Sequence, residues 1–473
     1  HGLIYADKPP LYFWFIMLSK ILFGSYQPWI IGLLSIVPAI GIIMVMDKWL
    51  AMEKIKHNLW ASNLMLITSG IFLGGILVLR MDVLMAFFIT LSLYTFYKIY
   101  TKKDKPYDKW LLPIYIFLGI FTKGAMGFLT PIMSIVGFLI IKKEIRHFGH
   151  YFGLKQWGIL IGLCLVWFSL VYVDGGSEYL NNILFKQTVG RGINSFHHKE
   201  PFYYYLPRII FTFAPWSLLY LSTLIKGAWR HNFSTDIEKF FITIIVVNFV
   251  MLSLISSKLD IYLVPIYPFV AYLTSMLLMR NKPSALIITC IAIPAVVVAL
   301  IFPASYMLKE MIPYKYQSLT IIRIGLFVVS AGGVAAIVYL WKREINGAIS
   351  AISLGLLGML FIASFDIEQF GKYIGYKEMA NVAKKIATEN MTENYAYYKF
   401  VNAPNMDVYI GQQLKEMETV QQLDSLSQIS EKTILFIRGH EIRDEKVLSL
   451  WLTNRTESYT CGDYKIFIIG KGQ

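Results

Sequence analysis

Apolar runs long enough to cross a lipid bilayer recur from about residue 26 to residue 364 of this 473-residue chain. A membrane-spanning helix needs about 20 predominantly apolar residues. With 56% hydrophobic and 15% aromatic residues, the chain carries more apolar surface than a soluble domain can bury. We therefore predict a mainly α-helical, polytopic transmembrane domain with about 11 to 12 spans. The candidate spans are 26–46, 59–79, 83–100, 110–122, 124–141, 157–173, 207–225, 239–256, 261–279, 285–302, 321–340 and 347–364. The run 110–122 is short, and a re-entrant segment is its alternative.

The chain becomes more polar after residue 365. Helical patterns at 378–388 and 444–452 alternate with strand patterns at 395–401, 433–438 and 464–469. This order predicts a small α/β domain of about a hundred residues. We expect a transmembrane domain over 1–365 and an extracytoplasmic domain over 366–473. The latter has no glycine-rich phosphate loop, cysteine cluster or nucleophile elbow, so docking of an acceptor or shielding of a cavity is its expected role.

The net charge of +14 would suggest nucleic acid as the partner of a soluble protein. Here the basic residues collect instead in alternate loops between the apolar runs, which is the topology signal of a membrane protein. We therefore expect no nucleic-acid partner, and we place these loops in the cytoplasm. The basic residues are Lys48, Lys54 and Lys56; Lys98, Lys102, Lys103, Lys105 and Lys109; Lys142, Lys143, Arg146 and Lys155; Lys226 and Arg230; Arg280 and Lys282; and Lys342 and Arg343.

The opposite set of loops would then lie outside, and it includes the long loop 174–206. Arg80, Asp82 and Lys123 directly abut apolar runs, and Lys258 and Asp260 occupy another short outer loop. A charge at membrane depth costs about 2.5 to 3.5 kcal/mol, so such residues usually face a cavity, pair or bind a ligand. Taken alone, each basic residue has an alternative role, which is to anchor the chain at the membrane interface. Together they predict a basic cavity with carboxylates inside it, which suits a phosphate attached to a lipid.

The stretch 5–14, which reads Tyr-Ala-Asp-Lys-Pro-Pro-Leu-Tyr-Phe-Trp, places a carboxylate beside an ammonium ahead of two prolines. The prolines stiffen the loop and hold Lys8 in an extended conformation. Residues 11–23 then have the pattern of an amphipathic interfacial helix with Lys20 on its wet side. We expect an outer loop and interfacial helix over 1–25. A solvated ion pair is the alternative interpretation of Asp7 and Lys8.

The long outer loop carries Arg191 and the run from His197 to Glu200 ahead of an aromatic belt. Adjacent histidines point in different directions in regular structure, which argues against a metal site built from both. One histidine joined to a carboxylate such as Asp7 remains open, and ordinary loop hydrogen bonding is the alternative. The three cysteines, Cys164, Cys290 and Cys461, show neither paired nor metal-ligand spacing.

Five stretches of the chain resemble the polyprenyl-phosphate-dependent glycosyltransferases of the C-type fold. Within that family they resemble the group of lipid A aminoarabinose transferases and protein O-mannosyltransferase-like enzymes. Their order, spacing and common outer side carry the resemblance over about residues 1–280. The stretches are 7–14 (DKPPLYFW); 80–82 (RMD); 121–124 (FTKG); Arg191 with 198–207 (HKEPFYYYLP) and 215–216 (PW); and 257–265 (SKLDIYLVP).

The resemblance implies a lipid-linked sugar donor whose phosphate is held by basic residues while an acceptor hydroxyl attacks the anomeric carbon. Lys8 matches the family's phosphate-contacting lysine, and Arg191 and Lys258 fall where other basic contacts would be. Arg80 and Lys123 complete the expected donor phosphate site. Lys8 is thus expected to take part in catalysis as well as in binding.

Asp82 matches the second acidic motif of the family, and we predict that it is catalytic if it faces the cavity. Its alternative role is a structural salt bridge with Arg80 or Lys123. Asp7 stands where the aminoarabinose transferases have a glutamate that looks like a metal ligand, and His198 matches a partner histidine. No cofactor is otherwise expected. Further expected cavity residues are Tyr5, Tyr262 and Asp260.

The sequence thus predicts a multi-pass glycosyltransferase of the bacterial cytoplasmic membrane, with its active site and C-terminal domain on the periplasmic or exterior side. The acceptor would be lipid A, a protein or another glycan. The family's first outer loop carries an acidic motif, and this chain begins with His1, downstream of it, so we expect an N-terminally truncated sequence. A transporter or flippase of lipid-linked sugars is the rival interpretation, because intramembrane charges also mark transport paths. A scaffold protein is a third, which leaves the outer charges unexplained.

Overall fold

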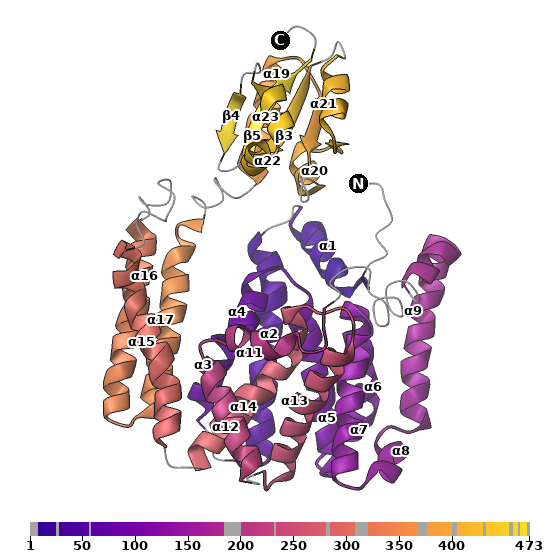
Figure 1. Cartoon of the computed structure of the whole chain (residues 1–473). Helices are drawn as coiled ribbons and strands as arrows, with labels where there is room; N and C mark the ends of the chain where they lie inside the picture. The colour runs from indigo at the N-terminus through magenta and orange to yellow at the C-terminus, as the bar shows by residue number, and fades with distance from the viewer. Residues whose placement is uncertain are drawn as a thin grey trace. The chain divides into compact units, whose positions relative to one another are not determined.

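The computed structural model is mainly helical and divides into two compact units (Figure 1). The larger, called the helical unit here, comprises Ile4–Gln317 and Leu326–Met359, and the smaller, the C-terminal unit, consists mainly of Leu360–Gln473. The structure describes residues 8–24, 28–55, 58–183, 200–230, 233–280, 284–307, 320–367, 376–399, 404–428, 432–453, 457–461 and 464–470.

The first half of the helical unit runs from the aromatic N-terminal helix to a long helix. Its helices are α1 (Leu11–Phe23), α2 (Pro28–Met52), α3 (Leu59–Ile67), α4 (Gly70–Leu77), α5 (Asp82–Tyr100), α6 (Asp108–Lys123), α7 (Met126–Ile141), η1 (Ile145–His147), α8 (Phe148–Tyr151) and α9 (Leu154–Asn181). The second half has α11 (Tyr205–Thr212), α12 (Ser217–Trp229), α13 (Asp236–Leu254), η3 (Asp260–Ile266), α14 (Tyr267–Arg280), α15 (Ala285–Met307), α16 (Thr320–Trp341) and α17 (Ile345–Ser364).

Eight helices in the described chain are long and apolar enough to cross a membrane, and the bent pair α3–α4 adds a ninth if it is one span. The other three predicted spans are also helical but shorter. The spans 110–122 and 124–141 correspond to the 16-residue helices α6 and α7. The span 207–225 is divided between α11 and α12. The predicted polytopic helical fold is confirmed.

The bend of 70° between α3 and α4 was not predicted. A broken helix leaves backbone groups without partners, which is costly away from water. Here the indole N–H of Trp216 donates to Thr68 Oγ1 at 2.9 Å, and the amide of Gly70 donates to the carbonyl of Ala214 at 2.8 Å. The residues between α11 and α12 therefore supply an acceptor for the Gly70 amide at the break between α3 and α4, and a donor for the Thr68 side chain.

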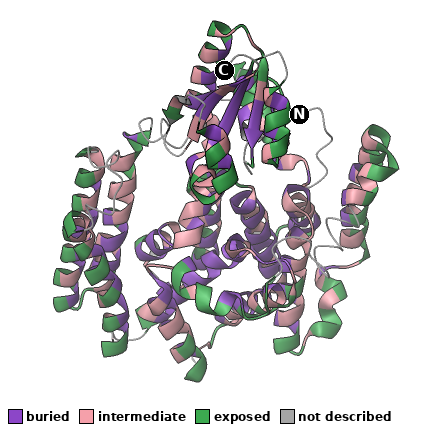
Figure 2. Ribbon diagram, turned by 45° about the horizontal axis from the view of Figure 1, so that its top comes forward, coloured by how far each residue is buried: buried purple, intermediate pink, exposed green. Residues whose placement is uncertain are grey.

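An aromatic cluster forms the centre of the helical unit, where Figure 2 shows the buried residues. The ring of Trp49 on α2 lies 5.1 Å from Phe241 on α13, and Phe138 on α7 lies 4.7 Å from Phe240. Tyr97 on α5 stacks on Phe240 at 5.7 Å. Aromatic pairs add about 0.5 to 1.5 kcal/mol beyond their area burial, so this cluster ties four helices together.

The outer surface of the helical unit is apolar as well. Only 11% of the apolar window of α9 is buried, and 28% of that of α15 (Figure 2). Leu165, Val166 and Val173 on α9 are all more than half exposed. A soluble protein rarely exposes so continuous an apolar surface. These faces fit contact with lipid.

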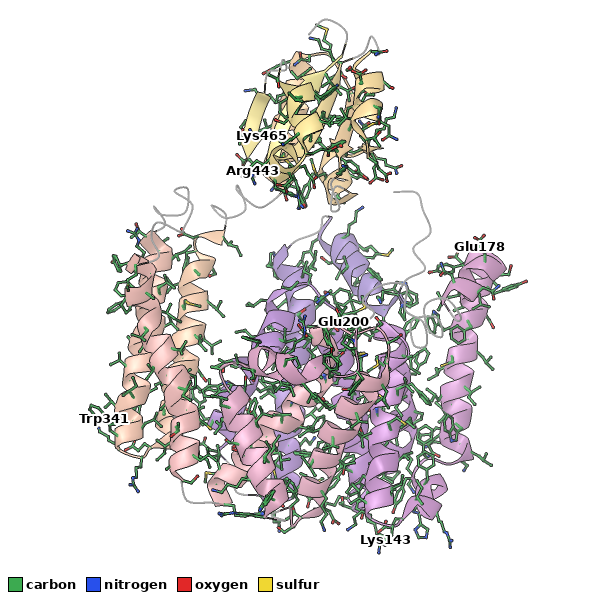
Figure 3. All side chains as sticks on the ribbon, in the orientation of Figure 1. Lys143, Glu178, Glu200, Trp341, Arg443 and Lys465 are labelled. Carbon is green, nitrogen blue, oxygen red and sulfur yellow. The ribbon has the colours of Figure 1, made fainter. Side chains whose placement is uncertain are left out.

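Charged residues lie at both ends of the helices rather than along them. Figure 3 shows Lys143 at one end of the helical unit and Glu178 at the other. At the Lys143 end, Lys142 after α7 pairs with Asp236 at the start of α13 at 2.8 Å. The two ends correspond to the two sets of loops that the charge pattern separates.

The C-terminal unit is a five-stranded sheet with helices on both faces. Its elements are α19 (Tyr376–Glu389), β1 (Asn394–Tyr398), α20 (Pro404–Ile410), β2 (Lys415–Met417), α21 (Val420–Ser427), β3 (Thr433–Arg438), α22 (Gly439–Asp444), α23 (Lys446–Leu452), β4 (Glu457–Cys461) and β5 (Tyr464–Ile469). The strand order is β2-β1-β3-β5-β4; β1 runs parallel to β2 and β3, whereas β5 is antiparallel to β3 and β4. The predicted strands 433–438 and 464–469 are found with these bounds.

Both faces of this sheet are covered. Met379 and Met406, from α19 and α20, pack on the face that includes Phe436. Leu423 and Leu448, from α21 and α23, pack on the opposite face. The parallel strands β1, β2 and β3 are therefore covered on both sides, as parallel sheets normally are.

The hairpin between α6 and α7 is unusually tight. A Cβ atom placed on Gly127 would lie 2.1 Å from the carbonyl carbon of Gly119. Gly124, in the turn between the helices, has φ +93° and ψ −144°, a region that is essentially restricted to glycine. Small residues let neighbouring helices approach closely in membrane proteins. The close approach fixes the position of Lys123, which ends α6.

We expect Gly127→Ala to lower the stability of the protein by about 1 to 3 kcal/mol, because an added methyl group overpacks this contact. Thermal unfolding of the protein in detergent measures the effect. Gly162→Ala is the matched control, since a Cβ on Gly162 of α9 meets nothing within 4 Å. The control should be neutral or stabilising by up to about 1 kcal/mol. Equal melting temperatures for the two variants would show that the contact is not tight.

Candidate active site

The residues predicted to form a site belong to helix ends that meet at one end of the helical unit. Asp82 begins α5, Lys123 ends α6 and Asp260 begins η3. The helix α5 packs against both α6 and η3, and α1 packs against α6. Three stretches that are far apart in the sequence therefore contribute charged side chains to neighbouring positions.

Asp82 and Lys123 form an ion pair, and both side chains are at least nine-tenths buried. Lys123 Nζ also lies 4.6 Å from the ring centroid of Tyr262 in η3. A buried ammonium is stabilised by a carboxylate and by the negative face of an aromatic ring. Of the two roles predicted for Asp82, the salt bridge to Lys123 is thus observed, whereas its catalytic role stays a prediction.

Lys258 is almost fully buried, with 2% of its surface exposed. Its ammonium donates a hydrogen bond to the carbonyl of Glu200 at 3.0 Å and another to the carbonyl of Ile255. The amide of Glu200 in turn donates to the carbonyl of Ser256 at 3.2 Å. Burial lowers the pKa of Lys258, and the nearby Glu200 carboxylate opposes the shift. Figure 3 labels Glu200 at this end of the unit. Lys258 ties the segment at Glu200 to the segment that follows α13, and its predicted phosphate contact is untested.

Asp260 takes part in a cluster that the sequence did not reveal. Arg208 Nη1 lies 2.9 Å from Asp260 Oδ2, and the guanidinium lies 4.2 Å from the ring centroid of Tyr204. Arg208 stands within the predicted span 207–225, where an arginine among apolar residues is a signal that points to a site. It adds a cation with an exposed side chain to this end of the unit.

Lys8 and Arg80, two of the predicted phosphate contacts, are more accessible than Lys123 and Lys258. Lys8 is half-buried and precedes the buried Pro9, and Arg80 is exposed between α4 and α5. The positive charge of Arg80 repels that of Lys123. The carbonyl of Arg80 accepts a hydrogen bond from Ser35 Oγ at 3.5 Å. Both cations are open enough to meet a ligand.

The helix α1 holds the Lys8 stretch against the bundle. The ring of Trp14 lies 5.2 Å from Phe121 on α6, and Phe121 lies 5.2 Å from Trp167 on α9. Several other apolar side chains of α1, among them Ile21 and Leu22, are exposed. A helix with one face on protein and an exposed apolar face fits the predicted position along a membrane interface.

Four predicted site residues lie outside the described residues, namely Tyr5, Asp7, Arg191 and His198. The metal site expected from Asp7 and His198 is therefore untested. Within the described stretches, no group of three or more His, Cys, Asp or Glu side chains is placed to hold a metal ion.

This end of the helical unit can bind an anion. Its described residues include five cationic side chains, those of Lys8, Arg80, Lys123, Arg208 and Lys258, and three carboxylates, those of Asp82, Glu200 and Asp260. Lys123 pairs with Asp82 and Arg208 with Asp260. Charges near low-dielectric surroundings interact more strongly than in water. The arrangement can stabilise a phosphate, and Asp82 can accept a proton when an anion draws Lys123 away from it.

A solved structure shares the fold of this chain, with its helical unit and its small α/β unit. A comparison with protein-family models gives no match. The crystal structure of ArnT from Cupriavidus metallidurans bound to undecaprenyl phosphate is similar, with a TM-score of 0.73 and 18% identity. The match covers 99% of this chain and 88% of that one.

Sequence relatives agree with this fold. The chain is 26% identical over 281 residues to the undecaprenyl phosphate-alpha-4-amino-4-deoxy-L-arabinose arabinosyl transferase of Wigglesworthia glossinidia brevipalpis, covering 56% of this chain and 47% of the relative. The transferase of the same name from Serratia proteamaculans is 25% identical over 274 residues, with 56% and 48% covered. An uncharacterized protein of Aquifex aeolicus is 28% identical over 325 residues, with 66% and 62% covered. The chain thus spans about half to three fifths of these relatives, and the resemblance predicted from the motifs is confirmed.

We expect Asp82→Asn, which leaves the buried Lys123 without its counter-ion, to destabilise the protein by about 3 to 5 kcal/mol. Lys123→Met should cost a similar amount, because it leaves the carboxylate unpaired. The double variant should recover most of the loss, since both charges are gone. A double-mutant cycle from unfolding in detergent measures this coupling. Additive losses would show that the two charges do not depend on each other.

Proposed function

We propose that this protein is a glycosyltransferase that moves a pentose or hexose from a polyprenyl phosphate carrier, such as undecaprenyl phosphate, to an acceptor. The charged helix ends around the buried pair of Asp82 and Lys123 carry this function, because they supply cations and a carboxylate together. The fold shared with an undecaprenyl phosphate-bound protein and the activity named for the sequence relatives support it.

In the proposed reaction, the acceptor oxygen attacks the anomeric carbon of the sugar while the bond to the carrier phosphate breaks. The departing phosphate gains charge, which fixed cations in a poorly solvated site stabilise more strongly than water does. Lys8 and Arg80 are the accessible cations for this task. Lys123, Lys258 and Arg191 would complete the donor site, with Tyr262 and Asp260 beside it.

Asp82 would act as the general base that accepts the acceptor's proton. Without donor its carboxylate is bound to Lys123. A phosphate that attracts Lys123 would compete for the ammonium and release the carboxylate, so donor binding and base activation would be coupled. Asp7 and His198, with Tyr5 nearby, are proposed to hold a divalent metal if the reaction uses one.

We further propose that the protein lies in a bacterial cytoplasmic membrane with the Asp82 end of the helical unit and the C-terminal unit outside. The basic loops, such as the one around Lys143, would then face the cytoplasm. This orientation would give the site access to acceptors of the cell envelope, which we infer to be lipid A, a protein or another glycan.

The test is the transfer of radiolabelled sugar from synthetic polyprenyl phosphate donors to extracted envelope lipids and proteins. We expect Lys8→Ala to reduce transfer at least a hundredfold, because removing one fixed donor that stabilises developing negative charge costs about 2.7 to 4 kcal/mol. Lys20→Ala, which changes an exposed lysine of α1, is the matched control and should transfer normally. Equal loss in both variants would contradict the role of Lys8.

The same assay separates transfer from transport. If the protein carries labelled lipid across proteoliposomes without consuming donor, it is a flippase and the transferase function fails. Labelled lipid A, protein or glycan identifies the acceptor when transfer occurs.

The double variant Asp82→Asn/Lys123→Met tests the base. We expect it to keep the fold, because both buried charges are removed together. Transfer should nevertheless fall by about 10² to 10⁴ because the base is lost, and further because Lys123 of the proposed donor site is lost with it. Transfer at the normal rate would leave Asp82 with a structural role alone.

A further inference from the structure

The C-terminal unit carries an open groove of about 620 Å³ between the end of β1 and the helices α21 and α23. Both charged and aromatic side chains line it, among them Lys399, Glu418, Gln421, Asp424, Glu445 and Trp451. Its size lies in the range of small-molecule sites. A second groove, which β2 and α21 line, shares Gln421 and Ser425 with it.

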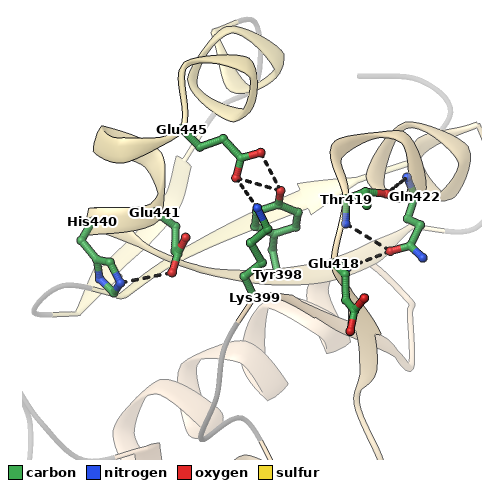
Figure 4. A network of polar contacts seen from close by, with 8 residues as sticks. All are labelled: Tyr398, Lys399, Glu418, Thr419, Gln422, His440, Glu441 and Glu445. Atoms are coloured by element: carbon green, nitrogen blue, oxygen red, sulfur yellow. Dashed lines mark hydrogen bonds and ion pairs between the residues drawn. The ribbon is translucent and has the colours of Figure 1, made fainter.

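Glu445 is held in place on one wall of this groove (Figure 4). Its carboxylate accepts hydrogen bonds from the Tyr398 hydroxyl at 2.9 and 3.0 Å and from Lys399 Nζ at 2.8 Å. These contacts, that to Lys399 foremost, hold the pKa of Glu445 below its ordinary value. The wall is therefore charged at neutral pH, and its ammonium is directed at a carboxylate.

The opposite wall is the first part of α21. The Thr419 hydroxyl accepts from the amide of Gln422, and the Gln422 side chain accepts from the amides of Glu418 and Thr419, at 2.7 and 3.2 Å (Figure 4). This capping box satisfies the free amides of the helix start. The amides are thus not available to an anion, whereas the exposed Glu418 side chain remains at the rim.

Trp451 provides an aromatic surface with a fixed orientation. Its indole N–H donates to Asp424 Oδ1 at 3.3 Å, which joins α23 to α21. The other oxygen of Asp424 accepts from the side chain of Gln428 at 3.3 Å. Carboxylate oxygens thus lie beside the edge of the indole ring, and the ring is partly exposed.

The charges of the groove exclude one class of ligand. Glu418, Asp424 and Glu445 oppose the single ammonium of Lys399, so a phosphate or another anion is repelled. The remaining polar side chains are the amide of Gln421 and the hydroxyls of Thr419 and Ser425. Thr419 Oγ1 already accepts from the amide of Gln422, and Ser425 Oγ already donates to the carbonyl of Gln421 at 3.0 Å. The Thr419 hydroxyl therefore keeps its proton for a ligand, the Ser425 hydroxyl keeps its acceptor lone pairs, and the Gln421 amide both donates and accepts. A ligand with many hydroxyl groups uses both hydrogen-bond donors and acceptors, whereas a basic peptide side chain needs acceptors alone.

We propose that this groove binds an uncharged or amino-bearing sugar ring of the acceptor, with the apolar face of the ring on Trp451 and its hydroxyl or ammonium groups on Glu418 and Asp424. This assignment rests on the transferase function proposed above, and it specifies that function: the acceptor is a saccharide recognised away from its phosphate groups. The C-terminal unit would then select the acceptor while the helical unit performs the transfer.

Binding to the full chain in detergent tests the assignment without any donor. The probes are the β-1,4-linked dimer of glucosamine, the corresponding N-acetylglucosamine dimer, glucosamine and glucosamine 6-phosphate, and saturation-transfer NMR measures their binding. We expect both dimers to bind and the phosphate to bind at least tenfold more weakly than glucosamine itself. Glu418→Gln with Asp424→Asn should weaken the glucosamine dimer at least tenfold, and Trp451→Phe should weaken both dimers.

Glu389→Gln is the matched control, because Glu389 is an exposed carboxylate of α19 outside the groove. It should leave binding unchanged. The assignment is overturned if neither dimer binds, if the control weakens binding as much as the groove variants, or if a tetralysine peptide binds with the same dependence on Glu418 and Asp424 while the dimers do not. The last result would make the groove a site for basic peptides.

Transfer kinetics separate this assignment from the proposed function. With a saccharide acceptor, the Glu418 and Asp424 variant should raise KM for the acceptor about tenfold and leave kcat unchanged. Lys8→Ala should abolish transfer but bind the dimers normally. Dimer binding by a protein that transfers no sugar from any donor would reject the transferase function and keep the groove. Transfer with an unchanged KM for the acceptor in the groove variant would reject the groove as the acceptor site and keep the transferase function.

Discussion

A buried carboxylate and a buried ammonium that depend on each other govern the architecture of the helical unit. Asp82 and Lys123 each lie at a helix end where water is largely excluded, and either charge alone would be costly to keep there. The pair is stable there because the helices α5 and α6 meet at that point and the ring of Tyr262 lies over the ammonium. A site with such a pair is also responsive, since any anion that binds the ammonium alters the carboxylate.

The remainder of the helical unit fixes this pair from several directions. The contact between Gly119 and Gly127 sets the turn after Lys123, and the aromatic cluster around Trp49 holds α5 against α2 and α13. The broken pair α3–α4 is closed by Trp216 from a distant part of the chain. Packing far from the charges thus determines how accurately they are placed, which is why the loops that carry them do not make the site alone.

Periodicity allowed much of this fold to be predicted from the sequence. Membrane helices and the strands 433–438 and 464–469 have continuous patterns, so their positions follow from composition. The edge strands β2 and β4 were missed, because β2 has only three residues and β4 has a register shift. The bend at Thr68 depends on a tertiary partner, Trp216, which no local pattern reveals. These elements needed long-range contacts that sequence reasoning does not supply.

Prediction from the sequence has the same limit for the charged residues of the site. Placing Asp82, Lys123 and Lys258 on one side required only the alternation of loops, but their partners required the structure. Lys258 is engaged by backbone carbonyls, and Arg208, which the sequence reasoning passed over, pairs with Asp260. A cation bound to carbonyls is held for packing, whereas an exposed cation such as Arg80 is free to meet solvent. We therefore expect donor binding and stabilisation of the leaving phosphate to depend most on the accessible charges, and proton transfer to depend on the buried pair.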